Sequence, residues 1–282
     1  VEDVPLGALR ADVILACLDS RRARMTVNQA AWRLGVPWIN AGVSGDDLIA
    51  RIQTFVPAPD AACLECAWDQ VDYDAVEHTY PCQAVVATAS TNAASSLGAL
   101  AASLQAIECA KLLAGDTNTS LVGRDLMVDA RHHRQFVTAF RRNAACRMSD
   151  HACWHIGKFD APASRLKLRA LLVVAGADGV AGDEVTIGVA GQRFALALRC
   201  HTCGATHHTF RLERSVRAGS RCRHCGAQLQ ISGFDLTDAA PLSAAPKRAL
   251  DLPLSRLGVR PGDVISLGTP STEARYEVGD EP

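Results

Sequence analysis

The stretch Asp12-Val13-Ile14-Leu15-Ala16-Cys17-Leu18-Asp19-Ser20 decides the fold class of this chain. Its apolar, partly β-branched run predicts a buried strand of the kind found in parallel sheets. Small and apolar residues then recur at helical spacing over 21–34, with Ser20 placed to cap this helix and Gly35 placed to end it. A second strand is expected over 38–43. Strand, helix and strand in this order form a βαβ unit, which predicts an α/β fold.

The bulk composition limits the classes of protein to be considered. The chain has 282 residues, 48% hydrophobic and 21% charged, which suffices for two ordinary domains with packed cores. A net charge of −1 and only 5% aromatic residues argue against a nucleic-acid-binding protein. No run of 18 or more apolar residues is free of polar interruptions, so we expect no membrane-spanning helix. The first residues include neither Met nor a basic leader, and we expect the sequence to begin inside a longer chain.

The use of cysteine indicates metal binding rather than disulfides. Six of the 11 cysteines fall in three Cys-x-x-Cys pairs, and the chain is too long for a small disulfide-stapled secreted protein. This pattern predicts zinc in a reducing environment, and therefore a cytoplasmic protein.

The remaining elements suggest a chain of three segments. After the βαβ unit we expect a strand, an exposed acidic loop, a long buried helix and two antiparallel strands, over 49–56, 69–83, 88–114, 121–129 and 134–141. A helix and two strands are expected next, over 165–174, 184–189 and 193–198. The predicted segments are a first domain over 1–157, a smaller β-rich zinc-ribbon domain over 160–240, and a linker with a C-terminal β segment over 241–282.

Asp19 is a candidate ligand for a metal ion beside a nucleotide. It lies just past the C-terminal end of the first strand, the edge at which open α/β sheets bind their ligands. A carboxylate there can hold Mg²⁺ next to a triphosphate, and Arg24, one helical turn later, can meet phosphate oxygens. Asn28 follows Arg24 at i+4 and so lies on the same face of the helix. The structural alternative is that an acidic residue near a helix start simply favours the helix dipole.

Cys63 and Cys66 form one half of a predicted zinc site. A tetrahedral site needs two further ligands, and Cys146 with His151 is the best pair, with Cys153 as the rival for the fourth position. Four protein ligands leave no open coordination position, so this zinc is expected to be structural. Unliganded buried thiols are the alternative.

A second structural zinc site is predicted later in the chain. Glycine follows each of two Cys-x-x-Cys pairs, at Gly204 and Gly226, as suits the tight turns of a zinc ribbon. The four predicted ligands are Cys200, Cys203, Cys222 and Cys225. The pair His207-His208 is expected on the surface rather than among the ligands.

Cys82 stands outside both sets of cysteines, in Tyr80-Pro81-Cys82-Gln83 on the predicted loop. A loop thiol can act as a nucleophile when its pKa is lowered, for instance by a helix N-terminus. An inert loop cysteine is the alternative.

These motifs occur together in an order that resembles a known family. The order is Asp19-x-x-x-x-Arg24-x-x-x-Asn28, the strand over 38–43, Cys63-x-x-Cys66, Ser103-Leu104-Gln105-Ala106-Ile107-Glu108, and Arg141-Arg142-Asn143-x-x-Cys146. It resembles the second half of the ThiF/MoeB/HesA family, bacterial relatives of ubiquitin-activating enzymes. The resemblance covers about the first 155 residues.

The resemblance implies a Rossmann-like ATP-binding sheet and a homodimer. Members adenylate the C-terminal carboxylate of a ubiquitin-like modifier or sulfur-carrier protein with MgATP, and release pyrophosphate. Carried over, Asp19 binds Mg²⁺ and the phosphates, and Arg24 and Asn28 support that pocket. Cys82 matches a loop cysteine that takes up a thioester or persulfide in many relatives. The implied zinc ligands are Cys63, Cys66 and Cys146.

Three departures from the family pattern limit the prediction. Ser149 occupies the position of the usual fourth zinc cysteine, so His151 is assigned instead. The family's glycine-rich phosphate loop belongs to the first half, and residues 160–282 have no counterpart in the minimal family. We therefore expect this stretch alone to be inactive. The alternative function is a catalytically inactive, zinc-braced scaffold that binds a ubiquitin-like partner.

Overall fold

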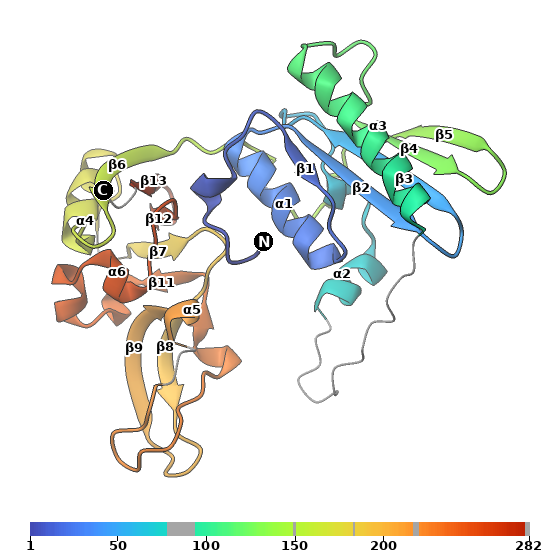
Figure 1. The fold of residues 1–282 in the computed structure, drawn as a ribbon. Coiled ribbons are helices and arrows are strands. Elements are labelled where there is room, and N and C mark those ends of the chain that lie inside the picture. Colours follow the sequence, from blue (N-terminus) through green and yellow to red (C-terminus); the bar gives the residue numbers. More distant parts are fainter. Residues whose placement is uncertain (78–93, 149–150, 183, 217–219, 280–282) are drawn as a thin grey trace. The chain divides into compact units, whose positions relative to one another are not determined.

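The structure of the chain, a computed structural model, forms two compact units (Figure 1). It describes residues 1–77, 94–148, 151–182, 184–216 and 220–279. Unit 1 comprises Val1–Glu2 and Leu9–Trp154, and unit 2 comprises Asp3–Ala8 and His155–Pro282.

Unit 1 is built on a five-stranded mixed sheet of order β1-β2-β3-β4-β5. β1 and β2 run parallel, with Ile14 opposite Trp38, and the following pairs are all antiparallel. The strands are β1 (Ile14–Ala16), β2 (Trp38–Ser44), β3 (Ile49–Phe55), β4 (Arg124–Asp129) and β5 (Arg134–Ala139). The predicted βαβ unit and α/β class are confirmed.

Local capping signals define helix α1 (Arg21–Leu34), which joins β1 to β2. The Ser20 hydroxyl accepts a hydrogen bond from the Ala23 N–H at 3.1 Å, which satisfies one free donor of the first turn. Gly35 ends the helix with φ of 69°, in the left-handed region that favours glycine. Both ends agree with the sequence prediction because each signal acts within one helical turn.

The sheet of unit 1 is covered by α1 on one face and by α3 (Ser95–Leu113) on the other. Successive residues of a strand point to opposite faces, so Trp38 packs with the α1 side and Ile39 with the α3 side. The two layers of core differ in character, because aromatic rings such as Phe55 lie on the α1 side and aliphatic residues fill the α3 side.

In the described part of the chain, α3 is the one helix long and apolar enough to span a membrane by length and composition. It nevertheless carries two buried polar side chains. Gln105 Nε2 donates to the Ile39 carbonyl at 2.8 Å, and Glu108 Oε2 accepts from the Leu121 N–H at 2.7 Å. These bonds tie α3 to the sheet and to the loop before β4. Only one side of the helix is buried, so α3 is less buried than the sequence predicted.

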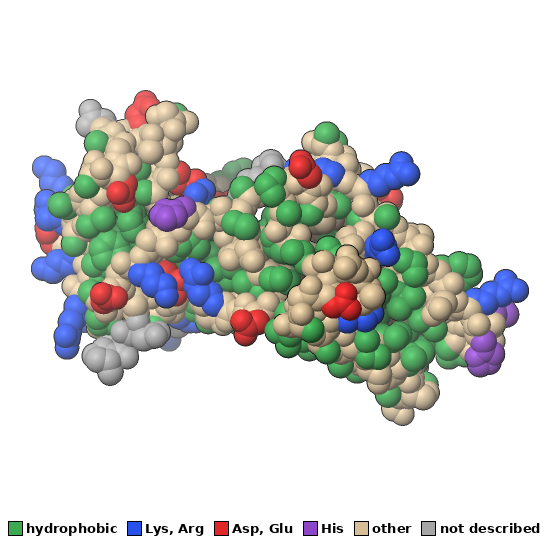
Figure 2. Space-filling model, turned by 90° about the horizontal axis from the view of Figure 1, so that it is seen from above, with side chains coloured by type: hydrophobic (Ala, Val, Ile, Leu, Met, Phe, Trp, Pro, Cys, Tyr) green, Lys and Arg blue, Asp and Glu red, His purple; other side chains and the backbone are tan. Residues whose placement is uncertain are grey.

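Hydrophobic side chains also gather on the surface of unit 1, at the right of Figure 2. Ile107 and Leu113 of α3 are 52% and 62% exposed, and Phe136 and Val137 of β5 are 45% and 53% exposed. Such residues are candidates for contact with another protein surface.

The predicted exposed loop over 69–83 is wrong in its first half, where helix α2 (Gln70–Glu77) forms. The Asp69 carboxylate accepts from the Asp72 N–H at 3.1 Å, a capping bond at the helix start. Tyr73 and Val76, three residues apart, are the buried face of this short helix. The sequence predicted a loop because the segment is rich in acidic residues and only two apolar residues recur at helical spacing.

Unit 2 contains two further sheets, of order β11-β7-β12-β13-β6 and β10-β8-β9. The strands are β6 (Gly157–Pro162), β7 (Thr186–Val189), β8 (Phe194–Arg199), β9 (Thr206–Leu212), β10 (Leu236–Thr237), β11 (Ala239–Pro241), β12 (Val264–Gly268) and β13 (Glu273–Gly279). The α-helices are α4 (Leu168–Ala177), α5 (Glu213–Val216) and α6 (Leu254–Leu257), and the 3₁₀ helices η4 (Leu242–Ala244) and η5 (Lys247–Asp251) precede α6. A large core, with Leu171, Ile187 and Phe194 fully buried, joins most of these elements, and a smaller one around Ala195 and Leu198 includes α5 and β10.

Residues 241–282 differ from the predicted linker and separate β segment. β12 pairs with β7, and β13 pairs with β6, so both strands complete a sheet that begins near residue 157. Leu254 and Leu267 are fully buried in the core of unit 2. The Pro- and Ala-rich composition reflects short 3₁₀ turns packed on that core.

Candidate metal centres and nucleotide pocket

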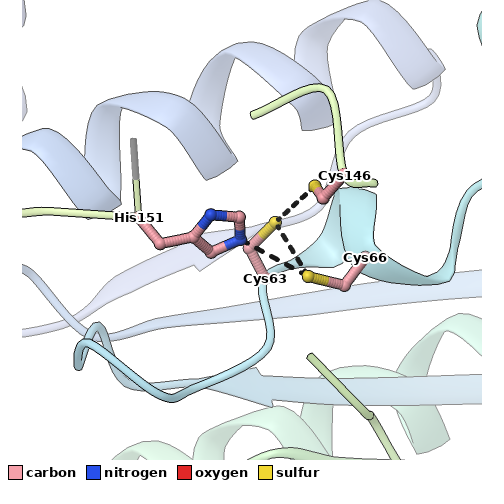
Figure 3. Close-up of side chains that lie close together, drawn as sticks. All are labelled: Cys63, Cys66, Cys146 and His151. Atoms are coloured by element: carbon pink, nitrogen blue, oxygen red, sulfur yellow. Dashed lines mark hydrogen bonds between the residues drawn. The ribbon is translucent and has the colours of Figure 1, made fainter. Parts of the chain in front are cut away.

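Three thiols and one imidazole converge in unit 1 (Figure 3): Cys63, Cys66, Cys146 and His151. Cys63 Sγ lies 3.8 Å from Cys66 Sγ and 3.7 Å from Cys146 Sγ. Cys66 Sγ lies 3.4 Å from His151 Nε2. Sulfur atoms bound to one tetrahedral zinc at about 2.3 Å are about 3.8 Å apart. The donor set and its spacing therefore fit a zinc ion with four protein ligands.

The surroundings of this cluster hold its ligands in place. Cys63 precedes the short 3₁₀ helix η2 (Leu64–Ala67), which carries Cys66, and the Cys66 N–H bonds back to the Cys63 carbonyl at 3.1 Å. The His151 ring packs edge-on against Trp32, with ring centroids 4.9 Å apart. The rival ligand Cys153 is exposed and lies outside the group, so the described residues favour His151 as the fourth ligand.

The thiols of the cluster differ in acidity. Burial raises the pKa of Cys63 and of Cys146 above the ordinary thiol value. Burial acts the same way on Cys66, but hydrogen bonds from the backbone of Asn143 and Cys63 outweigh it and leave the pKa of Cys66 lowered. A metal ion that binds all three as thiolates must therefore displace protons.

Asn28 lies behind this cluster and not in the phosphate pocket that the sequence predicted. Its side chain is fully buried, its Oδ1 accepts from the Leu64 N–H at 3.1 Å, and its Nδ2 donates to Glu65 Oε1 at 3.1 Å. Glu65 is itself 1% exposed and also accepts from Gln29 and Tyr73. Asn28 thus fixes the turn that carries Cys63 and Cys66, although it shares a helix with Arg24.

A second cluster forms in unit 2 from the four cysteines predicted to make a zinc ribbon. Cys200 Sγ lies 3.4 Å from Cys225 Sγ, and Cys203 Sγ lies 3.6 Å from Cys222 Sγ. The two halves repeat one turn, since the N–H groups of Gly204 and Gly226 each bond at 2.9 Å to the carbonyl of the first cysteine of their pair. This arrangement also fits tetrahedral zinc.

His207 lies closer to the second cluster than the sequence suggested. Its Nε2 is 3.3 Å from Cys222 Sγ, although the four-cysteine group is complete without it. An imidazole in this place can hydrogen-bond to a metal-bound sulfur and so adjust its charge.

Asp19 and Arg24 occupy the C-terminal end of β1, as predicted. Asp19 is exposed, and its charge acts on the half-buried Arg24. Burial and the neighbouring Arg51 lower the pKa of Arg24, while Asp19 opposes that shift. Arg24 Nε and Nη2 donate to the Leu18 carbonyl at 3.1 and 2.7 Å, and a Cβ on Gly42 would lie only 3.1 Å from Nη2. The guanidinium is therefore held at the strand end by its hydrogen bonds to the Leu18 carbonyl, and it fits there because Gly42 has no side chain.

A cavity of about 250 Å³ lies beside this guanidinium, lined among others by Arg21, Arg24 and Arg51. Two of its lining residues, Asn40 and Gln53, belong to a polar ladder across three strands that the sequence did not predict. Asn40 Nδ2 donates to Gln53 Oε1 at 2.7 Å, and Gln53 Nε2 donates to Asp125 Oδ2 at 3.2 Å. Because alternation placed these residues on the α1 side of the sheet, period-two patterning of β2, β3 and β4 could have revealed them.

Two predicted positions, Cys82 and Ser149, lie outside the described residues. The Ser-Leu-Gln-Ala-Ile-Glu stretch has a structural role in α3, since Gln105 and Glu108 are its buried polar anchors.

Known proteins resemble part of this chain. Ubiquitin-like modifier-activating enzyme 5 of Oryza sativa subsp. japonica is 46% identical over 56 residues, which are 20% of this chain and 13% of that protein. The Arabidopsis thaliana enzyme of the same name is 43% identical over 61 residues, which are 22% of this chain and 14% of that protein. The matched segment is thus a small part of these relatives' length.

Among solved structures, the crystal structure of E. coli MccB with succinimide aligns with 52% of this chain and 40% of its own, at 19% identity and a TM-score of 0.38. The model of the ThiF family matches residues 7–153, which include the sheet of unit 1, the first cysteine cluster and the pocket at Arg24. That match spans more than half of the sequence, and the chain belongs to the ThiF family.

Proposed function

We propose that this chain is part of an adenylyltransferase that activates the C-terminal carboxylate of a ubiquitin-like or sulfur-carrier protein with MgATP. The observation that carries the proposal is the position of Asp19, an exposed carboxylate just past the end of β1 whose charge acts on Arg24, one of the residues that line the cavity. Membership of the ThiF family and the names of the matched activating enzymes support it.

The proposed reaction needs positive charge around a nucleotide. An oxygen of the carrier's carboxylate attacks the α-phosphorus of ATP, and the bond to the bridging oxygen breaks, so that pyrophosphate leaves with the electron pair. Asp19 is suited to hold Mg²⁺, which usually keeps one or two carboxylates together with substrate phosphates. When bound, the ion offsets charge on the leaving pyrophosphate. Arg24 adds positive charge at the same edge of the sheet, and Arg51 also lines the cavity while it pairs with Asp125.

Both zinc sites are proposed to be structural, because each offers four protein ligands. A homodimer is proposed as well, supported by the exposed apolar side chains of α3 and β5. Cys82 is the proposed acceptor of the activated group: its thiolate attacks the acyl carbonyl, and AMP leaves. The cytoplasm is the proposed location, since its reducing conditions keep thiols available for zinc.

The test is ATP–pyrophosphate exchange by the full-length protein with a candidate carrier protein. We expect Asp19→Ala to abolish exchange with unchanged zinc content, and Asp12→Ala, which removes an exposed carboxylate before the same strand, to leave exchange intact. Exchange that is unchanged in Asp19→Ala sinks the assignment of this residue. Carrier binding without any exchange in the wild type would identify the inactive scaffold instead.

A further inference from the structure

The outer edge of β9 in unit 2 borders a groove of about 610 Å³. Among the described strands β9 pairs with β8 alone, at the end of the three-stranded sheet (Figure 1). Six consecutive residues of β9, 206–211, line the groove. Side chains of a strand alternate between the two faces of a sheet, so a consecutive run means that the groove follows the edge of the strand.

This edge has backbone groups available for a further strand. Half of the N–H and C=O groups of an edge strand point away from its sheet. Within the described part of the chain, residues 206–211 have no backbone hydrogen bonds other than those to β8. An extended peptide laid beside β9 could therefore form a regular ladder.

The walls of the groove carry positive charge. Five exposed arginines line it, and the described lining includes no acidic residue: Arg211, Arg221, Arg223, Arg248 and Arg256. None of the five forms an ion pair with a described residue. Of the seven described arginines of unit 2 outside the groove, five do form such ion pairs and Arg165 and Arg260 do not. The five are Arg169, Arg193, Arg199, Arg214 and Arg275. The groove therefore concentrates guanidinium groups whose charge is not balanced locally.

Apolar side chains share the groove with these arginines. Leu229 and Leu252 are partly exposed on its walls, and Leu252 is 38% exposed. A ligand that fits must combine negative charge with apolar side chains in an extended form.

We propose that this groove binds an extended acidic segment of a partner protein as an additional strand on β9. Backbone pairing with β9 supplies affinity, the arginines bind carboxylates, and the leucines receive apolar side chains of the segment. This binding uses neither ATP nor the pocket at Arg24, so it is independent of the adenylation proposed above.

Two other occupants fit the groove less well. A second copy pairing through its own β9 would bring two sets of unpaired arginines together, which opposes association. Single-stranded nucleic acid usually stacks bases on exposed aromatic rings, whereas Phe210 of the groove wall is only 3% exposed.

The test measures binding of a fluorescein-labelled octapeptide that alternates glutamate with valine, by fluorescence anisotropy with the 282-residue chain. We expect saturable binding that weakens about tenfold in the double variant Arg248→Glu/Arg256→Glu, since two attractive contacts become repulsive. The matched control is Lys158→Glu/Arg165→Glu, which makes the same charge change at exposed positions of unit 2 outside the groove.

A second measurement needs no protein variant. Two versions of the same peptide are N-methylated at every second residue, each along a different edge of the extended peptide. Both keep their charge, but only one of them loses the donors that would pair with β9. Loss of binding by one of the two edge-methylated peptides supports strand addition. Equal binding by both methylated forms, equal weakening in both double variants, or tighter binding of an oligothymidylate of equal length would overturn the proposal.

Discussion

Replacing Asn28 by alanine separates a structural role from the phosphate-binding role that sequence alone suggested. The variant leaves the buried Leu64 N–H without its acceptor and removes one donor from Glu65 Oε1. A buried group that loses its partner costs about 1–3 kcal/mol, and Glu65 keeps bonds from Gln29 and Tyr73. We therefore expect the free energy of unfolding of unit 1 to fall by about 3 kcal/mol, out of the roughly 5–15 kcal/mol typical of a domain.

Tryptophan fluorescence during urea unfolding measures this change in unit 1 alone. The chain has four tryptophans, at 32, 38, 68 and 154, and all lie in unit 1. Zinc release to a chromophoric chelator should be faster in Asn28→Ala, because the turn that carries Cys63 and Cys66 is loosened.

Thr26→Ala is the control on the same helix, since among the described residues the Thr26 hydroxyl donates only to the Arg22 carbonyl, within α1. It should change stability by less than about 0.5 kcal/mol. If Asn28→Ala is as stable as this control while pyrophosphate exchange is lost, the structural role is refuted. Asn28 would then act in nucleotide binding, as the sequence predicted.

Metal content and its pH dependence give two further predictions. Elemental analysis should find about two zinc ions per chain, and Cys146→Ala should lose one of them while the ribbon keeps the other; retention of both would refute the first site. Because burial raises the pKa of Cys63 and Cys146, these thiols are protonated near neutral pH without metal, and zinc binding releases protons. The affinity of the first site should therefore fall as pH is lowered from about 8 to 6, as measured by competition with a chelator, and a constant affinity would contradict this assignment.

The parts of the fold that sequence predicted well depend on short-range signals. Ser20 and Gly35 act within one turn of α1, and the alternation in β4 and β5 is local. The prediction for residues 241–282 was wrong because β12 and β13 pair with β7 and β6, which lie far away along the chain. The Pro- and Ala-rich composition of such a segment indicates its turns, but it does not show with which distant strands the segment pairs.

The candidate sites divide in the same way. The Cys-x-x-Cys spacing predicted both metal sites, and in the structure the predicted ligands of each site lie close together. The role of Asn28 could not be read, because its partner Glu65 is 37 residues away and only the fold places them in contact. Alternation places Asn40, Gln53 and Asp125 each on one face of its strand, but the contact of Gln53 with Asp125 depends on the pairing of β3 with β4, which are far apart along the chain.

The first cysteine cluster also has a topological consequence. Cys63 and Cys146 are 83 residues apart, so an ion bound between them closes a loop that contains α2, α3, β4 and β5. Closing so long a loop removes many conformations from the unfolded chain, much as a disulfide does. With zinc bound, a single peptide-bond cleavage between Cys66 and Cys146 leaves two pieces joined through the metal. Such pieces should migrate together in a native gel and separate once a chelator is added.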